Sequence, residues 1–352
     1  MRIITDWFKR NFSDPQIVFL TLVLLFGFAI VLTMGDMLAP VLASAVIAYL
    51  LEGLMVILDR KGISRSLAAP LVFIIFVVFL SLVLFGLLPM LSQQVYQFFQ
   101  NLPIMIAEGQ KALMTLPERY PEFLSPQQLQ EILDAVRREI ASFGQSVVSV
   151  SVSSVVGVLT LIVYLVLMPM LVFFFIKDKE KILHWFTNFL SGERNLANTV
   201  WFEVDKQIAN YVRGKFWEIM IVWAASFIAF EFFDLQYAML LSVIVGLSVV
   251  IPYVGATVVT IPVLMVAWFQ WGWGSDFLWV TIVYLIIQAL DGNVLVPLLF
   301  GEVVNLHPVA IIVAILVFGG IWGFWGVFFA IPLATLVNAI LRAWPKQIEK
   351  AI

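Results

Sequence analysis

Residues 216–341 decide the fold, because this stretch contains no Lys or Arg and is almost entirely apolar. It begins with FWEIMIVWAASFIAFEFF (residues 216–233) and includes FLWVTIVYLIIQALDGNVLVPLLF (residues 277–300). A helix needs about 20 apolar residues to cross the hydrocarbon core of a bilayer, and soluble domains do not expose surfaces of this kind. The stretch therefore predicts membrane helices joined by short connections.

The composition of the whole chain also indicates a membrane protein. Hydrophobic residues make up 62% of the chain and charged residues 12%, about half the charged share of a soluble domain. Cysteine is absent, which excludes disulfides and thiol chemistry, and no basic patch indicates nucleic-acid binding. We expect an all-α polytopic membrane protein whose partners are the lipid bilayer and a small solute or cation.

About eight hydrophobic segments have the length of a membrane span. Two of them are long and interrupted, residues 238–271 and 309–341. The first segment is too long for a signal-peptide core, and no small-residue cleavage site follows it, so we expect it to be retained. The continuous segments are residues 17–34, 38–58, 67–90, 147–176, 216–233 and 277–300.

These segments divide the chain into six predicted regions. The order is three membrane spans, an external helical segment on the periplasmic side, a fourth span, a cytoplasmic amphipathic segment, a transport core that contains the broken segments, and a cytoplasmic tail. The corresponding residues are 1–90, 91–146, 147–176, 177–215, 216–342 and 343–352.

The orientation follows from Lys and Arg, which are enriched in short cytoplasmic loops. All but four of the 20 Lys and Arg residues lie near the termini, at residues 60–65 or within residues 177–215, and those four lie within residues 91–146. We therefore expect both termini in the cytoplasm of a bacterial inner-membrane protein. Each broken segment must then end on the side where it begins, either as a re-entrant hairpin or as two short spans.

The two broken segments resemble each other in sequence. The first contains PYVG (residues 252–255) followed by Ile-Pro at 261–262, and the second contains GFWG (residues 323–326) followed by Ile-Pro at 331–332. Paired breaks that enter from opposite sides indicate a transporter site near the midplane. The alternative is a chance match, since Gly and Pro are common in membrane helices.

A polar cluster interrupts the last continuous segment. Gln288 and Asp291 are three residues apart and share a helix face. A carboxylate at this depth costs roughly 2.5–3.5 kcal/mol on insertion scales, so it should be paired, protonated or hydrated. The predicted substrate- or ion-binding residues are Gln288, Asp291, Asn293, Asn305 and His307. Alternatively, the helix ends at Asp291 in the headgroup region, and His307 only caps a helix.

Helix breaks near this cluster would free backbone carbonyls to coordinate a cation or a polar substrate. The predicted breaks are Pro252, Gly255, Gly292, Pro297, Gly323 and Gly326. His307 has a side chain that can relay protons near neutral pH. These features together favour a transport site.

Three other features remain open in the sequence. SPQQ (residues 125–128) fits a capping box before an amphipathic helix, which would be a lid or a gate. An apolar stripe at residues 182–189 fits either an interfacial helix or one packed on the protein's own spans. Glu52 is the other carboxylate that looks buried, and the alternative is an interfacial residue, because its span ends near Leu58.

Motifs for catalysis are missing. There is no Gly-rich loop ending in Gly-Lys-Ser/Thr and no Gly-x-Ser-x-Gly elbow. His184 and His307 have no carboxylate at metal-ligand spacing. We therefore expect neither an enzyme nor a metal or cofactor site.

Several motifs together resemble the AI-2E family of bacterial inner-membrane permeases, in its PerM-type subgroup. They include LAP (38–40) through AYLLE (48–52), YVRGK (211–215), IPYVG (251–255), QALDGNVLVP (288–297), LHP (306–308), and GFWG with the following Ile-Pro. Many family members have Glu where this chain has Asp291. The resemblance implies a transporter associated with autoinducer-2 export or with sodium/proton exchange. It also implies a homo-oligomer such as a pentamer.

The leading hypothesis is a secondary transporter that exports a small organic solute or couples to an ion. One alternative is a sodium/proton antiporter in which Asp291 carries the charge. Another is a scaffold without transport activity, which would act through its external helices and an oligomeric ring.

Overall fold

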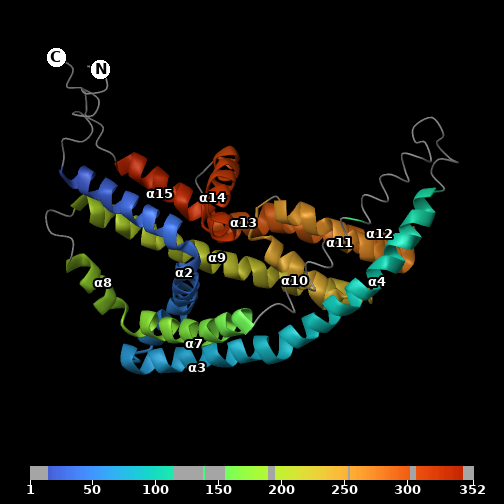
Figure 1. The fold of residues 1–352 in the computed structure, drawn as a ribbon, viewed down its shortest axis with the longest axis horizontal. Coiled ribbons are helices and arrows are strands. Elements are labelled where there is room, and N and C mark those ends of the chain that lie inside the picture. Colours follow the sequence, from blue (N-terminus) through green and yellow to red (C-terminus); the bar gives the residue numbers. More distant parts are fainter. Residues whose placement is uncertain are drawn as a thin grey trace, which may run out of the picture. The chain divides into compact units, whose positions relative to one another are not determined.

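The computed structural model describes residues 15–114, 138, 155–188, 195–252, 254–301 and 307–343, and the regular structure of these residues is helical (Figure 1). The elements are α2 (Pro15–Arg60), α3 (Arg65–Leu82), η1 (Val83–Leu87), α4 (Leu88–Met114), α7 (Val155–Lys177), α8 (Lys179–Asn188), α9 (Asn195–Phe232), α10 (Ala238–Ser248), α11 (Val254–Trp271), α12 (Ser275–Leu290), η2 (Asp291–Leu295), α13 (Val296–Phe300), α14 (Pro308–Phe328) and α15 (Ala330–Ala343). The predicted helix after residue 125 lies outside the described residues.

Five stretches of the described residues are long and apolar enough to cross a membrane. These candidate spans are Met37–Arg60, Arg65–Gly109, Val254–Trp271, Ser275–Phe300 and Val309–Phe328. Shorter apolar helices occupy Val163–Lys177 and Ala238–Ser248. The chain is thus a multi-pass α-helical membrane protein, as its composition predicts.

The first three predicted segments are joined differently from the expectation. The segments at 17–34 and 38–58 form the single helix α2, with a non-helical residue at Met34 (φ −123°, ψ 15°). The third segment continues past residue 90 through the π-helical turn η1 into α4. The polar residues between the first two segments are too few to stop a helix, so that boundary appears as a kink instead of a loop, and η1 lies inside the third segment.

Both π-helical turns stand at the same distance from a proline. Pro89 follows η1 and Pro297 follows η2, in each case two residues after the turn ends. Because proline has no N–H, the carbonyl four residues earlier, in the middle of each turn, loses its α-helical partner. Each turn also contains a glycine. Pro40 in α2 likewise follows a glycine, and there the helix is kinked at Met34 instead, whereas Pro70, Pro103, Pro169 and Pro262 have no glycine within five residues and leave the helix regular.

The two broken segments each fold as consecutive helices that pack on one another, α10 with α11 and α14 with α15. A Cβ on Gly255 would collide with the carbonyl oxygen of Ser248, and one on Gly326 would collide with that of Phe318. Gly323 has φ 56° and ψ −134°, a conformation that only glycine adopts readily. The sequence similarity of the two breaks therefore corresponds to a similar close approach of a glycine to a carbonyl seven or eight residues earlier, from α11 to α10 in the first break and across the kink within α14 in the second.

The chain forms two compact units. Unit 1 comprises Met1–Phe76, Val166–Ile219 and Gly292–Ile352. Its core contains Tyr211, whose hydroxyl donates to the carbonyl of Phe328 at 3.0 Å and whose ring lies 5.8 Å from that of Phe300. Gly214 allows this contact, because a Cβ there would lie 2.6 Å from the Phe300 ring.

Unit 2 comprises Val77–Leu165 and Met220–Asp291. Helices α10, α11, α12 and α4 pack together within it. Gln94 Oε1 accepts from the backbone N–H of Leu240 at 2.8 Å, which satisfies a free donor at the start of α10. Asn101 donates to the hydroxyl of Tyr237 at 2.7 Å. These polar contacts fix α4 against the first of the two broken segments.

Candidate functional site

Asp291 is the first residue of η2, and the helix does not end there. It continues through η2 into α13 and reaches Phe300. The alternative that the helix terminates at Asp291 is therefore wrong, because Gly292 and Pro297 loosen the helix without breaking it. Between residues 277 and 300, Asp291 is the one residue with a formal charge, and its side chain is half-buried.

Gln288 begins a chain of hydrogen bonds inside unit 2. Its Nε2 donates to the hydroxyl of Tyr284 at 2.9 Å, and that hydroxyl lies 3.0 Å from Oγ1 of Thr260. The Thr260 hydroxyl donates its one hydrogen to the carbonyl of Ala256 at 2.7 Å. The Tyr284 hydroxyl must therefore be the donor in its hydrogen bond with Thr260. Sequence reasoning missed Tyr284 and Thr260, although the spacing of four between Tyr284 and Gln288 places both on one helix face.

The remaining predicted residues have different surroundings. His307 precedes α14 as its N-cap, and its Nδ1 accepts from the backbone N–H of Val309 at 3.3 Å. His307 therefore caps α14, and its role in binding or proton relay stays a prediction. Asn305 lies outside the described residues. Gln288 and Asp291 belong to unit 2 whereas Asn293 and His307 belong to unit 1, so their grouping in one site stays a prediction.

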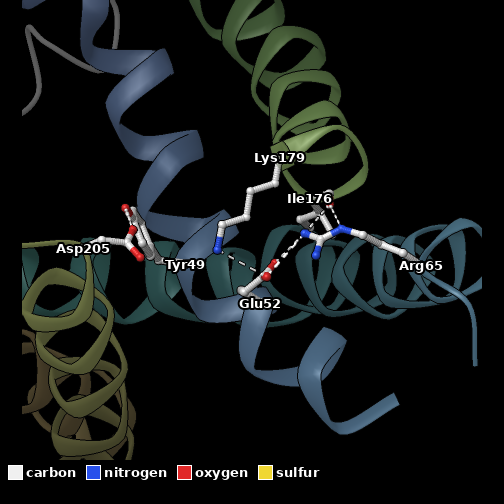
Figure 2. A network of polar contacts seen from close by, with 6 residues as sticks. All are labelled: Tyr49, Glu52, Arg65, Ile176, Lys179 and Asp205. Carbon is white, nitrogen blue, oxygen red and sulfur yellow. Dashed lines mark hydrogen bonds and ion pairs between the residues drawn. The ribbon is translucent and has the colours of Figure 1, made fainter. Parts of the chain in front are cut away.

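Unit 1 contains a second polar region, which we call the Glu52 network (Figure 2). Arg65 Nη2 donates to the two oxygens of Glu52 at 3.1 and 3.3 Å, and Lys179 Nζ lies 3.3 Å from Glu52 Oε1. Arg65 also donates through Nε and Nη2 to the carbonyl of Ile176, at 3.2 and 3.0 Å. Ile176 is in the last turn of α7, where carbonyls lack intrahelical partners, so Arg65 caps that helix.

The Glu52 network joins two charged stretches that are far apart in sequence. Residues 60–65 and residues 177–215 are the two internal regions that the positive-inside rule assigns to the cytoplasm. The contacts of Arg65 with Ile176, and of Lys179 with Glu52, bring them together within one unit. Their location on one side of the membrane therefore has support that is independent of charge counting.

A cavity of about 150 Å³ adjoins the Glu52 network. Beside it, the Tyr49 hydroxyl donates to Asp205 Oδ1 at 2.6 Å (Figure 2). The residues that line the cavity are Ala45, Ala48, Tyr49, Glu52, Phe175, Lys179, Ile182, Leu183, Trp201 and Asp205. The sequence left Glu52 open between a buried and an interfacial carboxylate, and its partners were missed because Lys179 and Arg65 come from other helices.

A buried ion pair lies near the core of unit 1. Lys215 Nζ is 2.6 Å from Glu218 Oε2, and the two side chains are 4% and 3% exposed. The Lys215 ammonium also lies 5.2 Å from the centre of the Phe300 ring. The positive-inside rule counts Lys215 among the cytoplasmic lysines, whereas in the folded protein its side chain is buried.

The described part of the chain contains no group of three or more His, Asp or Glu side chains that could hold a metal ion. The polar regions available for function are therefore the Asp291 turn with its Gln288 chain, and the Glu52 network with its cavity. Both consist of side chains that bind by hydrogen bonds and charge.

Sequence comparisons relate almost the whole chain to known membrane proteins. The profile of the AI-2E family transporter matches residues 18–346. The protein named "Putative permease PerM" of Escherichia coli (strain K12) is 47% identical over 345 residues, which cover 98% of this chain and 98% of that protein. The protein named "Putative transport protein YueF" of Bacillus subtilis (strain 168) is 25% identical over 343 residues, covering 94% of this chain and 92% of that protein.

Proposed function

Because this chain belongs to the AI-2E family of transporters, we propose that it is a secondary transporter of the bacterial inner membrane with Asp291 at its transport site. The solute is a small organic molecule of the autoinducer-2 class that leaves the cell, or one whose movement is coupled to an ion. Both termini lie in the cytoplasm, and neighbouring subunits associate as a homo-oligomer.

The observation that carries this proposal is the position of Asp291 at the start of a π-helical turn in the candidate span Ser275–Phe300. π-Helical turns widen the helix, shift its carbonyls and are frequent at functional sites. A carboxylate at membrane depth is costly and is found where an ion, a proton or a polar substrate passes. Asp291 and the loosened carbonyls of η2 offer oxygen atoms that can bind such an ion or substrate.

The Gln288 chain supplies the neutral part of the proposed site. Its hydrogen bonds run from Gln288 through Tyr284 to Thr260, which ties α12 to α11, the second half of a broken segment. The side-chain oxygen of Gln288 remains available to accept a hydrogen bond from a hydroxylated solute. Asn293, in the same π-helical turn, adds an amide to this set.

Flux in proteoliposomes tests the proposal. Purified wild type and Asp291→Asn are compared under imposed sodium and proton gradients, with Asp276→Asn as the matched control. Asp276 lies in the first turn of the same span, is exposed, and loses the same charge in its variant. We expect gradient-dependent flux in wild type and Asp276→Asn, and only the background of empty liposomes in Asp291→Asn. Equal flux in all three proteins would refute the assignment of Asp291.

A cation/proton antiporter is the second candidate, and it is favoured by the fact that the one charged residue of 277–300 is a carboxylate. A carboxylate can exchange a proton for a sodium ion without help from a solute. Sodium-dependent proton movement in the absence of any organic solute would select this candidate, whereas flux that requires the solute would select the exporter.

The π-helical turn can be tested separately from the charge. Pro297→Ala supplies the backbone N–H that an α-helix needs at position 297, so we expect the helix to become α-helical and Asp291 to change direction. Flux should fall although every polar side chain is kept. Unchanged flux in folded Pro297→Ala protein would show that the turn is not needed.

A further inference from the structure

We infer that the cavity beside the Glu52 network binds the headgroup of a zwitterionic lipid that carries a primary ammonium and a phosphate. This inference concerns unit 1 alone and does not depend on the proposed transport site at Asp291. The cavity has a volume of about 150 Å³ and lies among α2, α7, α8 and α9 (Figure 2).

One face of each helix lines the cavity. From α2 come Ala45, Ala48, Tyr49 and Glu52, at the spacing i, i+3, i+4 and i+7 that defines a single helix face. The two alanines keep the cavity open, because longer side chains at these positions would fill it. Helix α8 contributes Lys179, Ile182 and Leu183, and α9 contributes Trp201 and Asp205, again at helical spacings.

The polar groups in and beside the cavity carry opposite net charge at two places, and Arg65 belongs to the first through its contact with Glu52. At the first, one carboxylate, Glu52, meets two cations, Arg65 and Lys179, which leaves an excess of one positive charge. Lys179 makes one hydrogen bond, at 3.3 Å, so its ammonium has donors left for a phosphate.

The second place is the Tyr49–Asp205 pair. The Asp205 carboxylate accepts from the Tyr49 hydroxyl, and no Lys or Arg of the described ranges lies within ion-pair distance of it. It can therefore accept charge-assisted hydrogen bonds from an ammonium. The exposed indole of Trp201 borders the same cavity and attracts cations to its face. A ligand with an ammonium at one end and a phosphate at the other matches this arrangement.

The location of the cavity favours a lipid as the source of this zwitterion. The candidate span Met37–Arg60 ends eight residues after Glu52, about 12 Å along a helix, and the span Arg65–Gly109 begins at Arg65 itself. The third apolar helix, Val163–Lys177, ends two residues before Lys179. Two of these apolar helices thus end beside the cavity, whereas the lining residues of α2 lie in the middle of the span Met37–Arg60. The charged ends of the other two helices place the cavity where lipid headgroups meet the protein. Tryptophan and lysine are common at this depth.

Lipid-dependent thermal unfolding of the detergent-purified full chain tests the inference. The probes are short-chain phosphatidylethanolamine, phosphatidylcholine, phosphatidylglycerol and free phosphoethanolamine, each titrated separately. A ligand that binds the folded state raises the unfolding midpoint with a saturable dependence on concentration. We expect phosphatidylethanolamine to saturate the protein at about tenfold lower concentration than the other two lipids, because only its ammonium donates hydrogen bonds to Asp205.

Variants locate this preference in the cavity. Asp205→Asn keeps an acceptor for Tyr49 but loses the charge, and should lose about tenfold in the preference for phosphatidylethanolamine. Ala48→Leu fills the cavity and should abolish saturable binding without changing any charge. The matched controls are Asp178→Asn and Lys181→Gln, which remove a half-buried carboxylate and an exposed ammonium near the same helix and should behave as wild type.

Three results would overturn the inference. One is equal affinity for the three lipids in wild type, a comparison that needs no variant and so does not depend on how variants fold. The second is an unchanged preference in both Asp205→Asn and Ala48→Leu. The third is saturation by free phosphoethanolamine at the same concentration as by the lipid, which would assign the site to a soluble zwitterion.

Discussion

Two ion pairs of unit 1 have nearly the same geometry and opposite surroundings. Lys215–Glu218 and Lys181–Asp178 each join a lysine and a carboxylate three residues apart, at 2.6 and 2.8 Å. The first pair is 4% and 3% exposed, whereas Lys181 is 83% exposed. Water already solvates the exposed pair, while the buried pair has replaced water on both sides. Burial, and not the N–O distance, therefore decides how much each pair matters.

The largest effect is expected at the buried pair. Lys215→Met leaves the Glu218 carboxylate enclosed without its ammonium, which should lower the unfolding free energy by about 3–5 kcal/mol. The measurement is unfolding in detergent micelles titrated with sodium dodecyl sulfate. The double variant Lys215→Met/Glu218→Leu removes both charges and should recover most of the loss. A double variant that is as unstable as the single one would show that packing, and not charge, is responsible.

Arg65 should have the next largest effect, because it is 32% exposed yet bonds to both Glu52 and the end of α7. Arg65→Met should lower the unfolding free energy by about 1–3 kcal/mol, since the Ile176 carbonyl loses the side-chain donor that caps it and the Glu52 carboxylate keeps only Lys179. The matched control is Arg60→Met at the exposed end of α2. Equal losses of unfolding free energy in the two variants would show that the contacts of Arg65 with Glu52 and Ile176 do not stabilise the fold.

Lys179 is the second cation that contacts Glu52, and replacing it should lower the stability less than replacing Arg65 does. Its side chain is 33% exposed, and Glu52 keeps Arg65 when Lys179 is replaced. Lys179→Gln should change the unfolding free energy by about 0.2–1 kcal/mol, the range for solvent-accessible pairs. The same titration in low and high salt checks this, because screening should remove the difference. A loss that persists in high salt would contradict the assignment.

The exposed pair should have the smallest effect and a defined pH window. The hydrogen bond from Lys181 lowers the pKa of Asp178, and the same bond raises the pKa of Lys181. The contribution of Asp178 is thus present above its unfolded pKa and is lost as pH falls through the lowered value. That of Lys181 is lost as pH rises through its raised value. At pH 7 the contribution of Asp178 is present but small, so Asp178→Asn should lower the stability less than Lys179→Gln does, and a larger loss at that pH would contradict this ranking.

The sequence predicts those features that depend on local chemistry. Apolar length identifies the membrane helices, and the positions of Gly255, Gly323 and Gly326 identify where the broken segments turn. Pro297 and Gly292 indicate a loosened helix beside Asp291, which the structure shows as a π-helical turn. These features could be predicted because the backbone near a proline or a glycine is governed by residues within one or two turns.

Contacts between distant helices were not predictable in the same way. Nothing near Glu52 indicates that Lys179 will reach it, and nothing near Tyr49 indicates Asp205. The helix face formed by Ala45, Ala48, Tyr49 and Glu52 was a usable signal, since it combines small and polar residues at helical spacing. Its partners depend on how four helices pack, and a single sequence does not contain that information.

The bond from Arg65 to the Ile176 carbonyl also sets an order of events during synthesis. The two residues are 111 positions apart, while Arg65 and Glu52 are separated by only 13. At about 5–20 residues per second, the ribosome needs roughly 6–22 s to add the intervening chain. During that time Ile176 does not yet exist, so of these two contacts Arg65 can form only the one with Glu52. The Arg65–Glu52 ion pair can therefore form before α7 and Lys179 have been synthesised.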